Sequence, residues 1–259
     1  MGTLFRIVVY APAAGTAQAG ADAAFARVAE LDAVFSDYDS TSEIQRLARQ
    51  PAGVPVRVSG ELFTLLVRAN ELAAATDGAF DVTVGPVVQL WRRARRTGRM
   101  PSEAERNAAL ERVGYEKLGL DSSTRTVTIS TAGTQLDFGG IAKGAAADAA
   151  LGELRRRGLL RAIVAAGGDI AVGEPPPDSD GWTIDGGGAP AGRVYRNCGI
   201  STSGDANQYV EIAGVRYAHV VDPRTGLGVV GGPQVTVVAE SATESDALAT
   251  AAFVRSAKP

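Results

Sequence analysis

The sequence predicts a globular protein that mixes helices with strands, as one large domain or two interlocked halves. With 259 residues, the chain can bury a sizeable core. Hydrophobic residues make up 45% of it and charged residues 21%, which is typical of a soluble globular protein. Short, β-branched apolar runs alternate along the chain with segments whose apolar residues recur at helical spacing.

The charge balance argues against a polyanion as the main partner. The formal net charge is -3, so we expect no nucleic-acid binding. One local exception is a cluster of five arginines, namely Arg92, Arg93, Arg95, Arg96 and Arg99. Because the cluster precedes a new helix start, we interpret it as a solvated loop. The alternative is a nucleic-acid-binding patch, and a loop of this kind can also help to hold an anionic ligand.

Neither the cysteine count nor the hydropathy pattern identifies the cellular compartment of the protein. Cys198 is the single cysteine, so no intramolecular disulfide forms. The sequence shows neither a leader pattern nor an apolar run long enough to cross a membrane. We therefore expect a soluble chain without a transmembrane segment, in the cytoplasm or the cell envelope. A leader or anchor removed from upstream of Met1 would leave the same sequence.

The first third of the chain predicts a strand followed by helices. Residues 4–10 have strand character, and Phe25, Val28, Leu31 and Phe35 then recur at helical spacing. Residues 61–76 carry a second apolar stripe, which Gly78 would end. Ser102 and Glu105 form a capping-box signature for a further helix.

Residues 76–86 (TDGAFDVTVGP) alternate polar and apolar side chains between glycines. If this segment is extended, Asp81 and Thr83 point the same way. Carboxylates in such segments mostly cap or brace a loop, and a ligand contact is the alternative.

The chain is organised around residues 136–144 (LDFGGIAKG), which predict a strand end, a tight turn and a helix start. Glycines allow the backbone to approach a ligand, and the amides of a starting helix attract an anion. Lys143 adds a full positive charge, so a phosphate group is a suitable ligand for this turn. The alternative is a plain strand-to-helix turn with an exposed lysine.

The last third predicts several strands and a final helix. Strand patterns cover residues 127–129, 162–165, 208–212, 215–221 and 235–238. Ser245 can cap a helix that places Asp246 and Thr250 four residues apart on one face. Their oxygens are hard donors that suit magnesium. Alternatively, Asp246 is a helix N-terminal charge and Thr250 fills the core.

Seven segments, in order, resemble the signatures of one family, the FAD:protein FMN transferases of the ApbE type. They are MGTLFRI, SDYDSTSEI, TDGAFDVTVGP, LDFGGIAKG, ISTSGD, YAHVVDPRTG and ESDALATAAF. The resemblance covers nearly the whole chain, so it implies a single ApbE-like domain over residues 1–259. It also implies an α+β fold of mixed sheets packed with helices, with FAD in a cleft between two interlocked halves.

The resemblance implies an activity and a set of site residues. Members use magnesium to cleave FAD, release AMP and attach FMN to a threonine or serine hydroxyl of an acceptor protein, or they hydrolyse FAD to FMN and AMP. By resemblance, FAD would contact Met1, Tyr38, Ala79, Phe80, Asp81, Asp137, Lys143 and the backbone near Val221. Magnesium would be bound by the main-chain carbonyl of Gly140, the carboxylate of Asp246 and the hydroxyl of Thr250.

The attacking hydroxyl must lose a proton during phosphoryl transfer, and otherwise the reaction needs mainly positioning and charge neutralisation. His219 is the only histidine, and its pKa class suits a general base near neutral pH. Asp222 is the second candidate, either orienting the imidazole or acting as the base. A structural role for a lone histidine in a strand is the alternative. Arg224 and Thr225 are expected to shape the turn or to touch the phosphate.

Two other functions share these features. An FAD pyrophosphatase would use the same site with water as the acceptor. A non-catalytic flavin-binding protein would need no metal at the diphosphate, so Lys143, Asp246 and Thr250 argue against it.

Overall fold

The computed structural model describes residues 2–184, 192–205 and 208–257. Within them the chain forms two compact units, each assembled from three separate segments. The first unit contains residues 1–33, 141–203 and 235–249, and the second contains residues 34–140, 204–234 and 250–259. The predicted mixture of helices and sheets is confirmed. No helix of the described part combines the length and apolar character that crossing a membrane requires.

The first unit is built on a five-stranded sheet in the order β1-β5-β6-β9-β13. All four neighbouring pairs are antiparallel. The strands are β1 (Phe5–Val9), β5 (Ala162–Ala166), β6 (Asp169–Val172), β9 (Cys198–Ser203) and β13 (Val235–Ala239). A two-stranded sheet of β7 (Trp182–Thr183) and β8 (Val194–Tyr195) is separate from it. The strands predicted at residues 4–10, 162–165 and 235–238 are thus confirmed.

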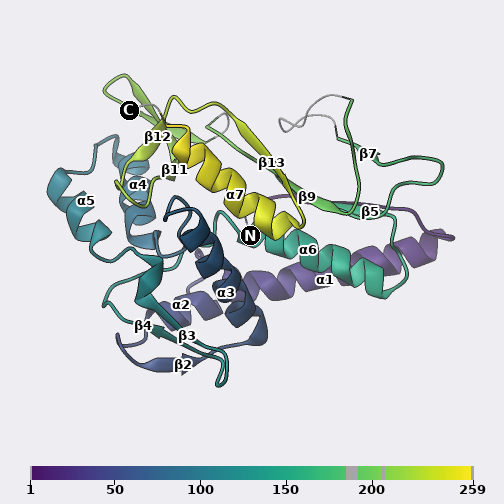
Figure 1. Cartoon of the computed structure of the whole chain (residues 1–259), viewed down its shortest axis with the longest axis horizontal. Helices are drawn as coiled ribbons and strands as arrows, with labels where there is room; N and C mark the ends of the chain where they lie inside the picture. Colours follow the sequence, from purple (N-terminus) through teal and green to yellow (C-terminus); the bar gives the residue numbers. More distant parts are fainter. Residues whose placement is uncertain (1, 185–191, 206–207, 258–259) are drawn as a thin grey trace. The chain divides into compact units, whose positions relative to one another are not determined.

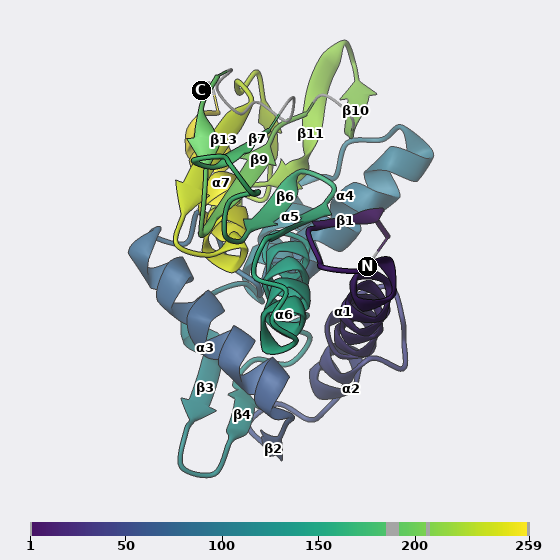
Figure 2. The ribbon, with the colours of Figure 1, turned by 90° about the vertical axis from the view of Figure 1, so that its right-hand side faces the viewer.

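Helices α1 (Ala14–Phe35) and α6 (Ala142–Arg156) run side by side in this unit (Figures 1 and 2). Both contribute to a core cluster with the sheet, in which Ala24 of α1 and Leu154 of α6 are fully buried. Small alanines on α6 let it pack closely on β5 and β6. Of the predicted α1 stripe, Leu31 and Phe35 are buried, whereas Phe25 is 43% exposed.

The second unit combines short helices with two three-stranded sheets. Its helices are α2 (Glu43–Ala48), α3 (Gly60–Ala75), α4 (Gly85–Thr97) and α5 (Glu103–Leu110), with a 3₁₀ turn η1 (Tyr115–Lys117). One sheet has the order β2-β4-β3, from β2 (Pro55–Arg57), β4 (Thr126–Ile129) and β3 (Leu118–Asp121). The other has the order β10-β11-β12, from β10 (Tyr209–Ile212), β11 (Val215–Val221) and β12 (Gly228–Val230).

The helix signals of the second unit are largely confirmed. Ser102 accepts the amide of Glu105, and the Glu105 carboxylate accepts the amide of Ser102, which completes the capping box of α5. Gly78 has a φ of +68° and donates its amide to Ala73, so it ends α3 as expected.

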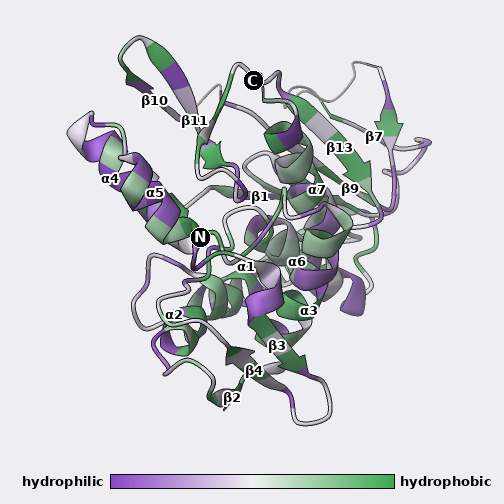
Figure 3. Ribbon diagram, turned by 60° about the vertical axis from the view of Figure 1, so that its left-hand side comes forward, coloured by the Kyte–Doolittle hydropathy of each residue, from purple (hydrophilic) through white to green (hydrophobic). Residues whose placement is uncertain are grey.

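The arginine-rich segment is a helix, not the solvated loop that the sequence suggested. Arg92, Arg93, Arg95 and Arg96 lie within α4, and only Arg99 follows it. Hydrophilic and hydrophobic residues alternate along α4 and α5 in Figure 3. Val87, Trp91 and Ala94 form the buried stripe of α4, and the Trp91 indole donates to the Gly226 carbonyl at 2.9 Å. This anchored apolar stripe stabilises the helix despite its many arginines.

The last helix, α7 (Ala242–Arg255), starts earlier than the sequence suggested. Ser241, not Ser245, accepts the amide of Glu244 and caps it. Ser245 lies inside the helix, fully buried, with its hydroxyl 2.7 Å from that of Ser201. Asp246 and Thr250 are one turn apart on α7, as expected.

Candidate active site

The central LDFGGIAKG stretch folds as a turn that leads into α6. The strand predicted before it is reduced to a single bridge between Val84 and Gln135, and the Asp137 amide donates to the Val82 carbonyl at 2.8 Å. Helix α6 begins at Ala142, and its N-cap residue Ile141 makes no side-chain capping hydrogen bond. The turn followed by a helix is as predicted, but the sequence placed the helix start after Lys143, whereas in the structure Lys143 lies within the first turn of the helix.

Lys143 lies between two buried carboxylates in the first unit. Its Nζ is 2.7 Å from Asp169 Oδ2 and 3.1 Å from Asp246 Oδ1. Asp246 Oδ2 also accepts the amide of Gly144 at 3.1 Å. The first turn of α6 and its lysine therefore hold the carboxylate of α7, and Lys143 is not the exposed turn lysine of the alternative interpretation.

These contacts set the ionisation of the cluster. The pKa of Asp246 is raised to about 7, because burial and the charge of Asp169 outweigh the opposite effects of Lys143 and the Gly144 amide. For Lys143, burial would lower the pKa, but the two carboxylates outweigh it and the pKa lies above its usual value. Two acids share one lysine, so the cluster is suited to an additional cation.

Asp169 was not among the predicted site residues. It stands at the start of β6 and is only 3% exposed. The available signal was the Gly167-Gly168-Asp169 run directly after a predicted strand. Its pairing with Lys143 depends on the register of β5 and β6, which the sequence does not state.

Gly140 and Thr250 meet within the second unit. A Cβ atom built on Gly140 would lie 2.9 Å from Thr250 Oγ1, closer than side-chain carbons normally approach. The absence of a side chain at residue 140 therefore allows the threonine hydroxyl to lie against this turn.

Asp137 and Tyr38 are joined by Arg92 of α4 in the second unit. Arg92 Nη2 is 3.1 Å from Asp137 Oδ2 and also pairs with Asp37. The guanidinium carbon lies 4.5 Å from the centre of the Tyr38 ring. The pKa of Asp137 is raised to about 6, because burial and the charge of Asp37 outweigh the opposite effect of Arg92.

The Ala79, Phe80 and Asp81 side chains are all buried. Asp81 Oδ1 accepts the amide and the hydroxyl of Thr83, each at 2.7 Å. Burial raises the pKa of Asp81, and these hydrogen bonds lower it. The side chain of Asp81 therefore braces a turn, as the sequence pattern of this segment predicted.

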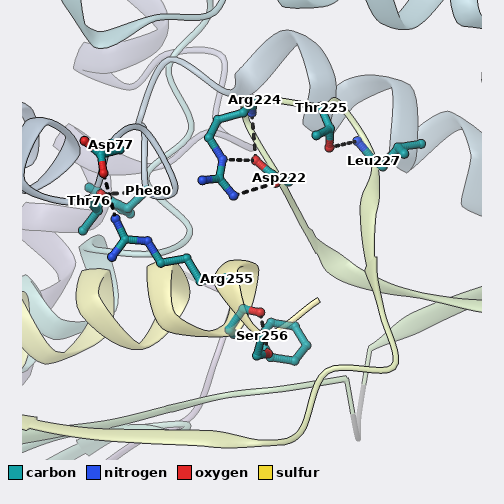
Figure 4. Close-up of polar contacts among 10 residues, drawn as sticks. Thr76, Asp77, Phe80, Asp222, Arg224, Thr225, Leu227, Arg255 and Ser256 are labelled. Atoms are coloured by element: carbon teal, nitrogen blue, oxygen red, sulfur yellow. Dashed lines mark hydrogen bonds and ion pairs between the residues drawn. The ribbon is translucent and has the colours of Figure 1, made fainter. Parts of the chain in front are cut away.

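His219 and Asp222 lie near the end of β11 and in the turn after it. His219 Nδ1 is 3.2 Å from the Gln208 carbonyl; because a carbonyl only accepts, Nδ1 is the donor and Nε2 is the basic nitrogen of the neutral ring. The Asp222 carboxylate accepts hydrogen bonds from the backbone amide, Nε and Nη2 of Arg224, each at 2.9 Å (Figure 4). Thr225 accepts the Leu227 amide, so Arg224 and Thr225 shape the turn.

The structure thus groups the predicted residues into sets. Lys143 and Asp246 meet in the first unit, Gly140 and Thr250 in the second, and Arg92 joins Tyr38 to Asp137. Val221 is buried in β11, and Met1 lies outside the described residues. No three His, Cys, Asp or Glu side chains of the described part are arranged to hold a metal. A metal ion would therefore depend on carbonyl and hydroxyl oxygens in addition to a carboxylate.

Solved structures of ApbE proteins share this fold. The ApbE protein of Thermotoga maritima superposes with a TM-score of 0.86 at 35% identity, covering 98% of this chain and 84% of its own. The flavin transferase ApbE of Vibrio cholerae superposes with a TM-score of 0.81 at 30% identity, with the same coverages.

The sequence comparison gives the same relatives. The ApbE family model matches residues 1–258. A FAD:protein FMN transferase of Treponema pallidum is 33% identical over 98% of this chain and 76% of its own length. One of Haemophilus influenzae is 31% identical over 87% and 69%. The chain therefore belongs to the ApbE family.

Proposed function

We infer that this chain is an enzyme, a flavin transferase that moves FMN from FAD onto an acceptor protein. The observation that carries this inference is the match, over almost the whole chain, to curated FAD:protein FMN transferases and to solved flavin transferases of the same fold. The ordered signature segments add support, because Lys143, Gly140, Asp246 and Thr250 are all present.

The donor atoms fit a magnesium ion. Asp246 offers a buried carboxylate in a cluster with more negative than positive charge, and Thr250 offers a hydroxyl against Gly140. These hard oxygens, together with the Gly140 carbonyl, are the ligands that we propose for Mg²⁺. When bound, the ion would neutralise charge on the FAD diphosphate and orient it.

The other proposed site residues would bind the substrate and accept a proton. We propose that the acceptor hydroxyl oxygen, from threonine or serine, bonds to the FMN phosphorus while the bond to the bridging oxygen breaks and AMP leaves with that oxygen. His219 takes the hydroxyl proton, which its Nδ1 contact with Gln208 supports by leaving Nε2 basic. Asp222 is the second choice as base, because both of its oxygens are bonded to Arg224.

The substrate site would combine residues of several elements. We propose that FAD contacts Met1, Tyr38, Ala79, Phe80, Asp81, Asp137, Lys143 and the backbone near Val221. Ala79, Phe80 and Asp81 are buried, so their contribution would come mainly from the shape and backbone of the turn. Tyr38 is 76% exposed and offers a ring for stacking.

Incubation with FAD and MgCl₂ tests this function. Purified protein and a candidate acceptor should yield AMP and an acceptor whose mass has increased by FMN, as measured by chromatography and mass spectrometry. Co-expression with candidate acceptors extends the search. AMP and free FMN without an acceptor would support the pyrophosphatase. FAD binding without AMP under any divalent metal would support a non-catalytic flavin protein.

A further inference from the structure

Arg92 is the one arginine of the α4 cluster whose contacts lead to two of the proposed FAD-binding residues. Its side chain is 27% exposed, whereas that of the neighbouring Arg93 is 51% exposed and pairs with Glu105 of α5. Arg92 reaches Asp137 of the central turn and covers the ring of Tyr38. The other arginines of α4 therefore lie at a solvent-exposed surface, and Arg92 has a different role.

Building on the proposed function, we propose that Arg92 is a positioning residue of the flavin site, which holds the Tyr38 ring ready to stack on a flat ring of FAD and fixes Asp137 beside it. A tyrosine ring has two faces, and the guanidinium covers one of them at 4.5 Å. Because Tyr38 is 76% exposed, its other face can accept a planar ligand.

The geometry requires a guanidinium rather than an ammonium. A guanidinium donates hydrogen bonds from its edge while its flat face stacks on an aromatic ring. Arg92 Nη2 contacts both Asp37 and Asp137, and the guanidinium of the same side chain lies over the Tyr38 ring. A lysine keeps the charge and can donate to both carboxylates, but it lacks the planar group that stacks on Tyr38.

Pre-ordering explains how Arg92 would act on binding. An exposed tyrosine must otherwise lose side-chain freedom when a ligand stacks on it, and this loss weakens binding. Arg92 also pairs with both Asp37 and Asp137, which offsets the repulsion between the two carboxylates and holds the Asp137 side chain in place. Both effects favour FAD binding and leave the chemical step unchanged.

The test is a double-mutant cycle on FAD affinity, measured by titration of flavin fluorescence. Arg92→Lys and Tyr38→Ala should each raise the Kd for FAD, Arg92→Lys by about 5- to 30-fold. If Arg92 acts through Tyr38, Arg92→Lys should add little in the Tyr38→Ala background. The KM for FAD should rise with Kd, while kcat at saturating FAD stays unchanged.

The matched control is Arg93→Lys, one residue away on the same helix, which should leave FAD affinity and the melting temperature unchanged. Wild-type affinity in Arg92→Lys, with loss of affinity only in Arg92→Met, would instead assign a direct charge contact and overturn the proposal. Fully additive effects with Tyr38→Ala would also overturn it. Failure of the wild-type protein to bind FAD would refute the proposed function, a result distinct from these.

Discussion

Asp246 is the residue at which charge, burial and proposed metal binding meet. It is 3% exposed, it accepts hydrogen bonds from Lys143 and Gly144, and Asp169 adds a second negative charge on the same lysine. A buried carboxylate in excess over its counter-ions is unfavourable unless another cation shares it. Its placement therefore favours a role in binding a metal over a purely structural one.

Asp246→Ala should abolish turnover while FAD affinity falls much less. The substitution removes the proposed metal carboxylate, and loss of metal assistance is expected to slow the reaction by about 1,000-fold or more. Magnesium should also no longer raise the melting temperature of the variant. The measurements are AMP release, an FAD titration and thermal shifts with and without MgCl₂. Full activity in Asp246→Ala would refute the metal assignment.

His219→Ala should lose FMN transfer with FAD still bound. General-base catalysis is worth about 10²- to 10⁴-fold, and the variant rate should fall by that factor. The acidic limb of the pH–rate profile should disappear with the imidazole. An unchanged rate would remove His219 as the base and favour Asp222, for which Asp222→Asn is the parallel experiment.

The site residues could be predicted from the sequence only where one segment contains the whole signal. Lys143 lies in a glycine-rich turn before a helix, and spacing placed Asp246 and Thr250 on one helix face, whereas the family resemblance assigned these residues to one site. Asp169 and Arg92 form their pairs across distant segments. No local sequence pattern predicts such a pairing, because the pairing depends on strand register and on how a helix packs.

At the scale of elements, the start of α7 depends on a side chain from α6. Asp148 Oδ1 accepts the Ala242 amide at 3.0 Å, and Oδ2 accepts the amide and hydroxyl of Thr243 at 2.8 and 2.6 Å. Ser241 caps the same turn. Burial raises the pKa of Asp148, and the Thr243 and Ala242 contacts lower it. A carboxylate on one helix thus satisfies the free amides of another.

Asp148→Ala should destabilise the fold by about 1–3 kcal/mol, because it leaves these buried donors without their acceptor. It should also weaken magnesium binding, since α7 carries Asp246 and Thr250. Urea unfolding measures the first effect and a Mg²⁺ thermal-shift titration the second. Asp22→Ala, at an exposed site on α1, should change stability by less than about 0.5 kcal/mol. Equal stability of the two variants would contradict the capping role.

Helices could be predicted where apolar residues recur at regular helical spacing, as in α3. They were missed where many charged residues lie among the apolar ones. The stripe of Val87, Trp91 and Ala94 was present in α4, but five neighbouring arginines suggested a loop. The start of α7 was misplaced because Ser241 and Ser245 are both plausible caps. Only the hydrogen bond from Glu244 to Ser241 distinguishes them.

At the scale of the whole molecule, the chain passes repeatedly between two units that the sequence does not delimit. The mixed fold was predictable, but not the assembly of each unit from three segments. Strand β1 pairs with β5, and β9 with β13, across long intervening stretches. Such long-range pairing has no local sequence signature, because the partners share only general strand propensity.

The stability of the whole molecule should depend on pH through Asp137. Its pKa is about 6 in the folded chain, against 3.8 for the unfolded reference, so the folded state binds this proton more tightly. The contribution of Asp137 to the free energy of unfolding is therefore fully present below pH 3.8, and it is lost as the pH rises through about 6. The difference amounts to roughly 3 kcal/mol at most. Exposed acids with lowered pKa values, such as Asp121 at about 2, act in the opposite direction, but only at lower pH.

Asp137→Asn should therefore make the melting temperature fall less steeply with pH between about 4.5 and 7.5, the remaining slope coming from other acids with a raised pKa, such as Asp246. The amide keeps the shape of the side chain without the titrating proton, so the difference between wild type and variant isolates this group from the others that titrate. Differential scanning fluorimetry in EDTA over this range measures it. Asp22→Asn, on the exposed face of α1, should leave the wild-type slope intact. If Asp137→Asn keeps that slope as well, Asp137 is ionised in the folded protein throughout this range, and its pairing with Arg92 outweighs both burial and the charge of Asp37.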